Sequence, residues 1–153
     1  MRALGIDYGR KRIGLALSDA TGLLARPWKT VARLGNTGQV AASLATEIQH
    51  LQQEDEGLAT IVLGYPRRLS GEATEQTSIV EALAESLRGL VNVPLVLQDE
   101  RLSSREAEAL LARREKDWRR RKPLLDAASA AVVLQDYLDS RPRNTELLED
   151  DRQ

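Results

Sequence analysis

The sequence predicts a single α/β domain in which three strands come first, followed by alternating helices and strands and then by two helices. The chain has 153 residues, which is the usual size of one domain. Its segments switch between the two-residue period typical of strands and the three- and four-residue spacing of helices. Hydrophobic residues make up 42% and Phe is absent. The core is therefore expected to be aliphatic, which favours helices packed on a sheet.

The first two strands are predicted at Arg2–Tyr8 and at residues 11–18, with a hairpin turn at Gly9 and Arg10. Large and small residues alternate in both strands, so one face carries the bulky side chains and the other is nearly bare. Asp7 shares the bare face with Ala3, Gly5, Gly14, Ala16 and Ser18. A helix of small side chains is expected to pack very closely on this face.

A weaker third strand is predicted at residues 23–34, and Pro27 within it suits an edge of the sheet or a bend. The next segment, residues 39–53, places apolar residues at helical spacing and predicts a helix. Gly57 follows it as a stop signal.

Residues 59–64 are apolar throughout and predict a strand buried on both faces. A second helix at residues 72–90 and a short fifth strand at residues 94–98 follow. Ser103 and Glu106 have the spacing of a capping box, so a third helix is expected to start just after the DER triplet.

Pro123 predicts the first turn of a last helix. Its apolar stripe consists of Leu124, Ala127, Ala131, Leu134 and Leu138, and alanines at 127, 128, 130 and 131 make it slim. This helix matches the bare face of the first two strands and would bring Asp126 toward Asp7. The domain is expected to span residues 1–140, and the polar, acid-rich residues 141–153 to form a disordered tail.

The composition excludes several classes of site. The chain has no Cys and a single His, which excludes a disulfide framework, a thiol nucleophile, thiolate zinc sites and poly-histidine metal sites. No apolar stretch approaches the roughly 20 residues that span a bilayer, and the start lacks the pattern of a secretory signal. A cytoplasmic protein without a membrane partner is expected.

Three acidic stretches each place a carboxylate at the end of an apolar run: Asp7, then Asp99 and Glu100, then Asp126. Carboxylates gathered in one site repel one another unless a cation neutralises them or one is protonated. Mg²⁺ or Mn²⁺, which prefer oxygen ligands, would neutralise them and support phosphodiester cleavage. Singly, each acid also has a structural explanation as a helix or turn cap, and spacing does not choose between Asp99 and Glu100.

Cations surround the predicted acidic sites. Residues 113–122 hold seven Lys or Arg against two acids, although the net charge of the chain is only -1. A solvated helix end is the alternative interpretation of that segment. The cations predicted to contact a phosphate backbone are Arg10, Lys11, Arg12, Arg67, Arg68, Arg101, Arg119, Arg120, Arg121 and Lys122. Their placement favours a polyanionic substrate, although Arg101 also suits an internal salt bridge.

Four motifs occur in order along the chain: GIDYGRKRIGLALSD, LGYPRRLSG, QDERLSSREAE and LLDAASAAVVLQDYLD. In these motifs the chain resembles the YqgF (also called RuvX) proteins of the RNase H-like superfamily, which includes the RuvC Holliday junction resolvases. The resemblance implies an RNase H-like core with a five-stranded mixed sheet flanked by helices. It also implies that Asp7, Glu100 and Asp126 are the catalytic and metal-binding acids, with Asp99 a lesser candidate.

The function implied by the resemblance is that of an endonuclease dependent on Mg²⁺ or Mn²⁺ that processes the 5′ end of pre-16S rRNA. The expected partner is then RNA, either free or associated with the ribosome. A Holliday junction resolvase acting on branched DNA and a non-catalytic RNA-binding ribosome-assembly factor are the alternatives. The segment around Asp7, Gly9 and Gly14 also resembles the first phosphate loop of actin-type ATPases, but the chain has no room for their second domain. The oligomeric state, monomer or homodimer, stays open.

Overall fold

The computed structural model describes residues 1–65, 75–99 and 118–141, and of residues 118–124 the backbone alone. The helix predicted to start near Ser103 and Glu106 lies outside the described residues, as does nearly all of the predicted tail at 141–153. None of the described helices has the length and apolar character needed to cross a membrane.

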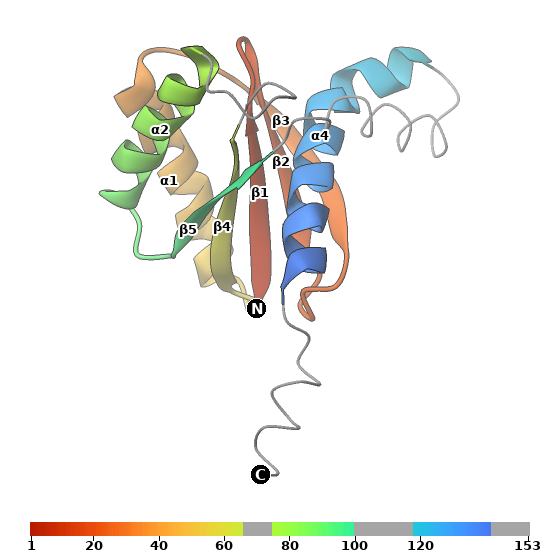
Figure 1. Cartoon of the computed structure of the whole chain (residues 1–153). Coiled ribbons are helices and arrows are strands. Elements are labelled where there is room, and N and C mark those ends of the chain that lie inside the picture. The colour runs from red at the N-terminus through yellow and green to blue at the C-terminus, as the bar shows by residue number, and fades with distance from the viewer. Residues whose placement is uncertain (66–74, 100–117, 142–153) are drawn as a thin grey trace.

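A five-stranded mixed sheet forms the middle layer of the structure (Figure 1). The elements in chain order are β1 (Arg2–Tyr8), β2 (Arg12–Ser18), β3 (Ala25–Ala32), α1 (Thr37–Gln53), β4 (Leu58–Tyr65), α2 (Glu75–Arg88), β5 (Leu95–Asp99) and α4 (Trp118–Ser140). The strand order is β3-β2-β1-β4-β5, antiparallel among the first three strands and parallel from β1 through β4 to β5. The predicted α/β class and sheet are confirmed.

The two faces of the sheet have different cores. On one face α1 and α2 cover a large aliphatic cluster that includes Leu4, Ile6 and Leu15. On the other face α4 lies across β1, β2 and β3 (Figure 1), over a smaller cluster rich in alanine. The predicted pairing of a slim helix with the bare face is confirmed.

β3 lies at an edge of the sheet, as Pro27 predicted. Proline lacks a backbone N–H, and a residue of an edge strand needs none on the side without a neighbouring strand. Its pairing with β2 shifts register between Leu15 and Ala16, since Leu15 pairs with Lys29 and Ala16 with Pro27. The strand is shorter than the predicted 23–34. The Asp19 carboxylate accepts hydrogen bonds from the Leu23 and Leu24 N–H groups, which folds that part into a turn.

Two predicted helix starts are wrong. α1 begins at Thr37, before the predicted residue 39, because Asn36 and Gln39 form a reciprocal capping box. α4 begins at Trp118, so Pro123 lies past the first turn. The basic residues before the proline are strong helix formers and extend the helix backward.

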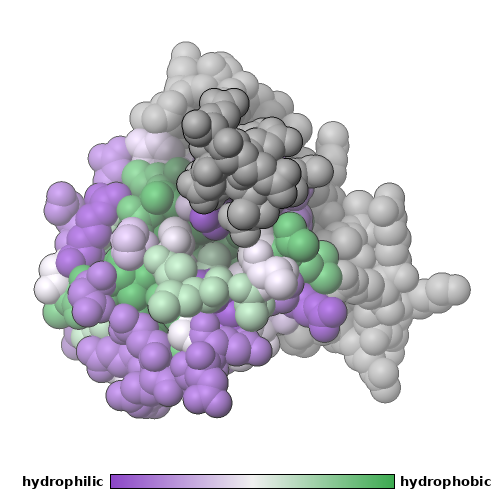
Figure 2. All heavy atoms as spheres, turned by 90° about the horizontal axis from the view of Figure 1, so that it is seen from below, coloured by the Kyte–Doolittle hydropathy of each residue, from purple (hydrophilic) through white to green (hydrophobic). Residues whose placement is uncertain are grey.

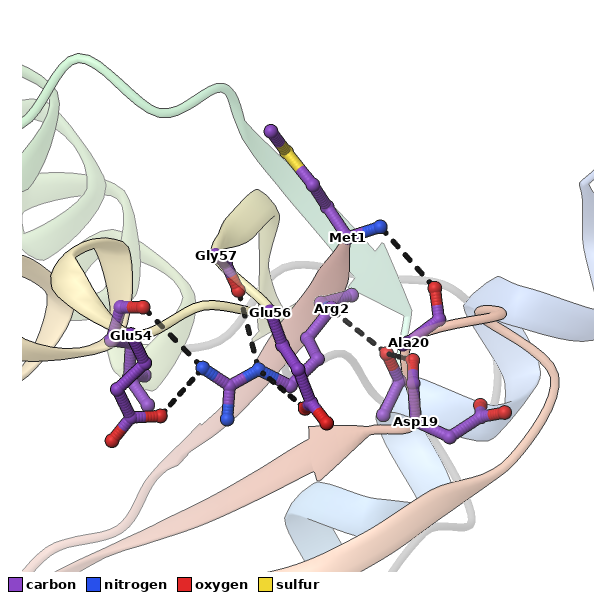
Figure 3. A network of polar contacts seen from close by, with 10 residues as sticks. Met1, Arg2, Asp19, Ala20, Glu54, Glu56 and Gly57 are labelled. Carbon is purple, nitrogen blue, oxygen red and sulfur yellow. Dashed lines mark hydrogen bonds and ion pairs between the residues drawn. The ribbon is translucent and has the colours of Figure 1, made fainter.

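Buried polar contacts hold the amino-terminal end of the sheet together. Arg2 is 8% exposed, and its guanidinium donates to the carbonyl oxygens of Leu51, at 3.3 Å, and Gly57, at 3.2 Å. It also pairs with Glu54 at 2.7 Å and Glu56 at 3.3 Å (Figure 3). These bonds tie the start of β1 to the end of α1.

The same end of the molecule, seen from below in Figure 2, has hydrophobic residues toward its middle and hydrophilic residues along its left and lower margins. Its exposed hydrophobic residues include Met1, Leu23, Leu24 and Leu90. The predicted acids Asp7 and Asp126 lie toward the opposite end of the sheet.

Candidate active site

The carboxyl edge of the sheet gathers the ends of three strands. β1, β4 and β5 run parallel, so their last residues lie at the same edge. Asp7 is next to last in β1, and its partner on the antiparallel neighbour β2 is Gly14. Asp7 thus sits on the α4 face, because Leu4, Ile6 and Tyr8 alternate with it and belong to the other core.

α4 approaches this edge so closely that a side chain at Gly14 would not fit. A Cβ there would lie 1.8 Å from the Asp126 carbonyl oxygen and 2.8 Å from the Ala127 nitrogen. A Cβ on Gly5 would lie 2.8 Å from the Ala130 oxygen. The structure therefore brings the backbone of Asp126 against the residue that pairs with Asp7, as the bare face predicted.

The Asp126 carboxylate is one-quarter exposed, and its Oδ2 lies 3.0 Å from Arg12 Nε. This oxygen is buried and has no hydrogen-bond partner among the described residues, so the contact with Arg12 is ionic without hydrogen-bond geometry. A buried carboxylate oxygen without a donor is costly. Such an oxygen fits a divalent cation, which takes hard oxygen ligands.

Of the two candidates for the second acid of the site, the structure describes Asp99 but not Glu100. Leu95 packs in the core under α1 and α2, whereas Val96 packs against the core under α4. Strand alternation then puts Asp99 on the face of Leu95, away from α4 and Asp7. Glu100 lies outside the described residues. Within the described ranges, no three acidic or histidine residues lie close enough together to hold a metal ion.

The cations predicted at the β1–β2 turn lie beside Asp7. The Gly9 N–H donates to the Arg12 carbonyl at 3.0 Å and closes this turn, and Arg10, Lys11 and Arg12 are all exposed. Arg119, Arg120, Arg121 and Lys122 lie near the start of α4, where the structure describes the backbone alone. Arg67, Arg68 and Arg101 lie outside the described residues.

One further cation, Arg33, reaches this turn and was missed in the sequence. Its N–H donates to the Lys11 carbonyl at 3.0 Å, and its Nη1 donates to the Gly9 carbonyl at 3.0 Å. Its guanidinium lies over the Tyr8 ring, 4.1 Å from the ring centre. The antiparallel pairing of the second and third strands could have predicted this position, because it brings the end of the third strand back to the β1–β2 turn.

Comparison with known families and proteins gives a consistent match. Residues 1–140 match the family described as RuvX, Holliday junction resolvase. A protein of Geobacillus kaustophilus named "Putative pre-16S rRNA nuclease" is 36% identical over 92% of this chain and 99% of its own length. A protein of the same name from Syntrophus aciditrophicus is 38% identical over 92% of this chain and 89% of its own length.

Solved structures share the fold at low sequence identity. The Holliday junction resolvase of fowlpox virus aligns with a TM-score of 0.59 at 13% identity, over 92% of this chain and 99% of that one. RuvC of Thermus thermophilus aligns with a TM-score of 0.55 at 13% identity, over 92% and 98%. These alignments show a RuvC-like, RNase H-like fold.

Proposed function

Because this chain belongs to the RuvX family, we propose that it is an endonuclease dependent on Mg²⁺ or Mn²⁺ that hydrolyses phosphodiester bonds in structured nucleic acid. Its proposed substrate is the 5′ end of pre-16S rRNA, the RNA for which its relatives are named. The proposed place of action is the cytoplasm, on free precursor RNA or on a ribosome-associated form.

The observation that carries this proposal is the buried Oδ2 of Asp126. Among the described residues it forms an ion pair with the half-exposed Arg12, which does not complete a hydrogen bond to it. The carboxylate also belongs to a helix pressed against Gly14, the partner of Asp7. A carboxylate oxygen that lacks a hydrogen bond, on a helix packed against the strand neighbour of a second acid, is suited to cation binding.

In the proposed site Asp7, Glu100 and Asp126 hold the metal ion. When bound, the metal supplies a Lewis acid for the phosphodiester and lowers the pKa of the attacking water. The chain's own acids contribute negative charge and fixed oxygen positions. Asp99 is excluded from the proposed ligand set, because it belongs to the face of Leu95.

The proposed cation contacts bind and orient the substrate. The turn at Arg10, Lys11 and Arg12 presents three positive charges next to Asp7, and Arg12 also pairs with Asp126. Contacts of this kind go to phosphates and fix the position of the backbone without reading its sequence. They suit RNA and DNA equally.

The test compares native protein with Asp7→Asn and Asp126→Asn. Asp139→Asn is the matched control, because Asp139 is an exposed carboxylate on the same helix as Asp126. Labelled pre-16S rRNA and a four-way DNA junction are incubated with Mg²⁺ or Mn²⁺, and Mn²⁺ binding is followed separately by calorimetry. We expect the two site variants to lose both cleavage and metal binding, and the control to keep both.

The outcomes separate the alternatives. Cleavage of the junction but not of the RNA would favour a resolvase acting on branched DNA. RNA binding without a carboxylate-dependent metal site would favour a non-catalytic assembly factor. Undiminished cleavage by Asp7→Asn would refute the proposed mechanism.

A further inference from the structure

An open groove of about 560 Å³ lies on the other side of the β1–β2 turn from Asp126. We call it the Arg33 groove, and it is lined by Arg10, Arg33, Gly35, Glu75, Gln76 and Ile79. In Figure 1 the turn and the start of α2 lie together at the top of the molecule. Gln76 joins them, because its Nε2 donates to the Tyr8 carbonyl at 2.9 Å.

The two arginines of this groove are not neutralised by carboxylates of the described residues. Arg12 pairs with Asp126, and Arg2 pairs with two glutamates at the far end of the sheet. Neither Arg10 nor Arg33 lies within 4.0 Å of a carboxylate in the part of the chain that the structure describes. The groove also contains one acid, Glu75, so its lining side chains carry a net positive charge.

Two contacts hold the Arg33 guanidinium in one orientation. Stacking on Tyr8 and the bond from Nη1 to the Gly9 carbonyl fix the plane of its guanidinium. One of its five N–H donors is used by that bond, and the guanidinium makes no other hydrogen bond to the described residues. A planar, fixed guanidinium with spare donors suits a phosphate group.

The groove is built on the same turn as the candidate active site. Tyr8, under the Arg33 guanidinium, directly follows Asp7 in β1, and strand alternation points the two side chains to opposite faces. A strand of nucleic acid that lies on the α4 face can therefore reach the groove by crossing the carboxyl edge over Gly9 and Arg10.

We propose that the Arg33 groove binds a backbone phosphate that flanks the scissile one, and that Arg33 is its main ligand. This inference rests on the proposed nuclease function and extends the substrate's footprint to both faces of the sheet. Glu75 opposes this binding and weakens it.

The experiment measures binding of the full chain to fluorescently labelled pre-16S rRNA 5′ leader and to a labelled four-way DNA junction. EDTA prevents cleavage, and the salt concentration is varied from about 50 to 200 mM. The variants are Arg33→Gln, Glu75→Gln and the matched control Arg26→Gln. Arg26 is an exposed arginine at the other end of β3 from Arg33.

We expect Arg33→Gln to weaken binding roughly tenfold and to reduce the slope of log affinity against log salt by roughly 0.7–0.9. Glu75→Gln should tighten binding, because it removes the acid that repels the phosphate. Arg26→Gln should match native protein. A purely structural Arg33 would instead lower the melting temperature and leave the salt slope unchanged.

An unchanged salt slope in Arg33→Gln overturns the inference, as does an equal change in Arg26→Gln. If Arg33→Gln does not fold, Glu75→Gln decides, and unchanged affinity in that variant overturns the inference. Native protein that neither binds nor cuts these nucleic acids would refute the proposed function as well. Native protein that cuts them, together with Arg33→Gln that binds like native, would refute this inference alone.

Discussion

Gly14→Ala tests the contact that places the backbone of Asp126 against the strand partner of Asp7. The added Cβ would lie 1.8 Å from the Asp126 carbonyl oxygen, and the obstacle is helix backbone, which has no rotamer to move away. To restore a contact of 3.4 Å, the helix at Asp126 must retreat by roughly 1.5 Å.

The expected cost follows from that displacement. Overpacking of this kind lowers the free energy of unfolding by about 1–3 kcal/mol, which for a domain of this size lowers the melting temperature by roughly 3–10 °C. A misplacement of about 1 Å in a catalytic group reduces the rate on the order of a hundredfold. Gly14→Ala should therefore lose far more cleavage than its stability loss explains.

The assay is thermal unfolding followed by cleavage at a temperature at which every variant is folded. Gly5→Ala is the first comparison, because its Cβ meets Ala130 at 2.8 Å, about one turn of α4 beyond Asp126. It should destabilise the fold but reduce cleavage less than tenfold. Gly38→Ala, whose Cβ meets nothing closer than 3.5 Å, should be as stable as native protein or more so.

Two results would refute the reasoning. If Gly14→Ala melts within about 1 °C of native protein, then α4 does not press on β2 as described. If Gly5→Ala and Gly14→Ala lose cleavage equally at matched stability, then the loss does not come from the position of Asp126.

Three further perturbations address other parts of the fold. Arg2→Met should lower the free energy of unfolding in urea by roughly 1–3 kcal/mol, because it leaves two backbone carbonyls without a buried donor; an unchanged midpoint would contradict this. The pKa of Asp19 is lowered from 3.8 to about 2, chiefly by the hydrogen bond from Thr21. Its carboxylate therefore stabilises the fold above pH 3.8, and this contribution is lost as the pH falls toward 2. In Asp19→Asn the melting temperature should therefore fall less steeply between pH 3.8 and pH 2 than in native protein. Parallel curves of melting temperature against pH would contradict this. Arg12→Gln should change the free energy of unfolding by less than about 1 kcal/mol, because the Arg12 side chain is half exposed. The same variant should bind nucleic acid more weakly than native protein. A larger loss in the free energy of unfolding would show that the pair with Asp126 serves to stabilise the fold.

Local patterns were enough to predict the five strands and the packing of the helix that carries Asp126, whereas the mixed sheet was implied by the family resemblance. Alternation in the first two strands identified the bare face, and the alanines of the last helix identified what covers it. Both are properties of single elements, and a Cβ at Gly5 or Gly14 would meet the backbone of that helix. Pro27 predicted its edge position for an equally local reason, the missing N–H.

Other features do not follow from the periodic pattern of a single element. The start of α4 depends on the helix propensity of residues before Pro123, which outweighs the usual place of a proline in the first turn. The face of Asp99 depends on the packing of Leu95 under α1 and α2. The position of Arg33 depends on the register of β3 against β2. None of these is encoded in a short periodic pattern.

The long sequence separation between α4 and the strands it covers has a consequence during synthesis. The Ala25 N–H donates to Gln135 Oε1, which lies 110 residues further along the chain. At translation speeds of roughly 5–20 residues per second, the part of α4 that covers β3 is synthesised roughly 5 to 20 seconds after that strand. A nascent chain therefore presents one uncovered face of the sheet to the ribosome exit region. Because β1 and β2 carry glycine and alanine on that face rather than bulky aliphatic residues, this part of it offers chaperones and neighbouring nascent chains little hydrophobic surface to bind. In the proposed site, Asp126 is the last of the three acids to be synthesised.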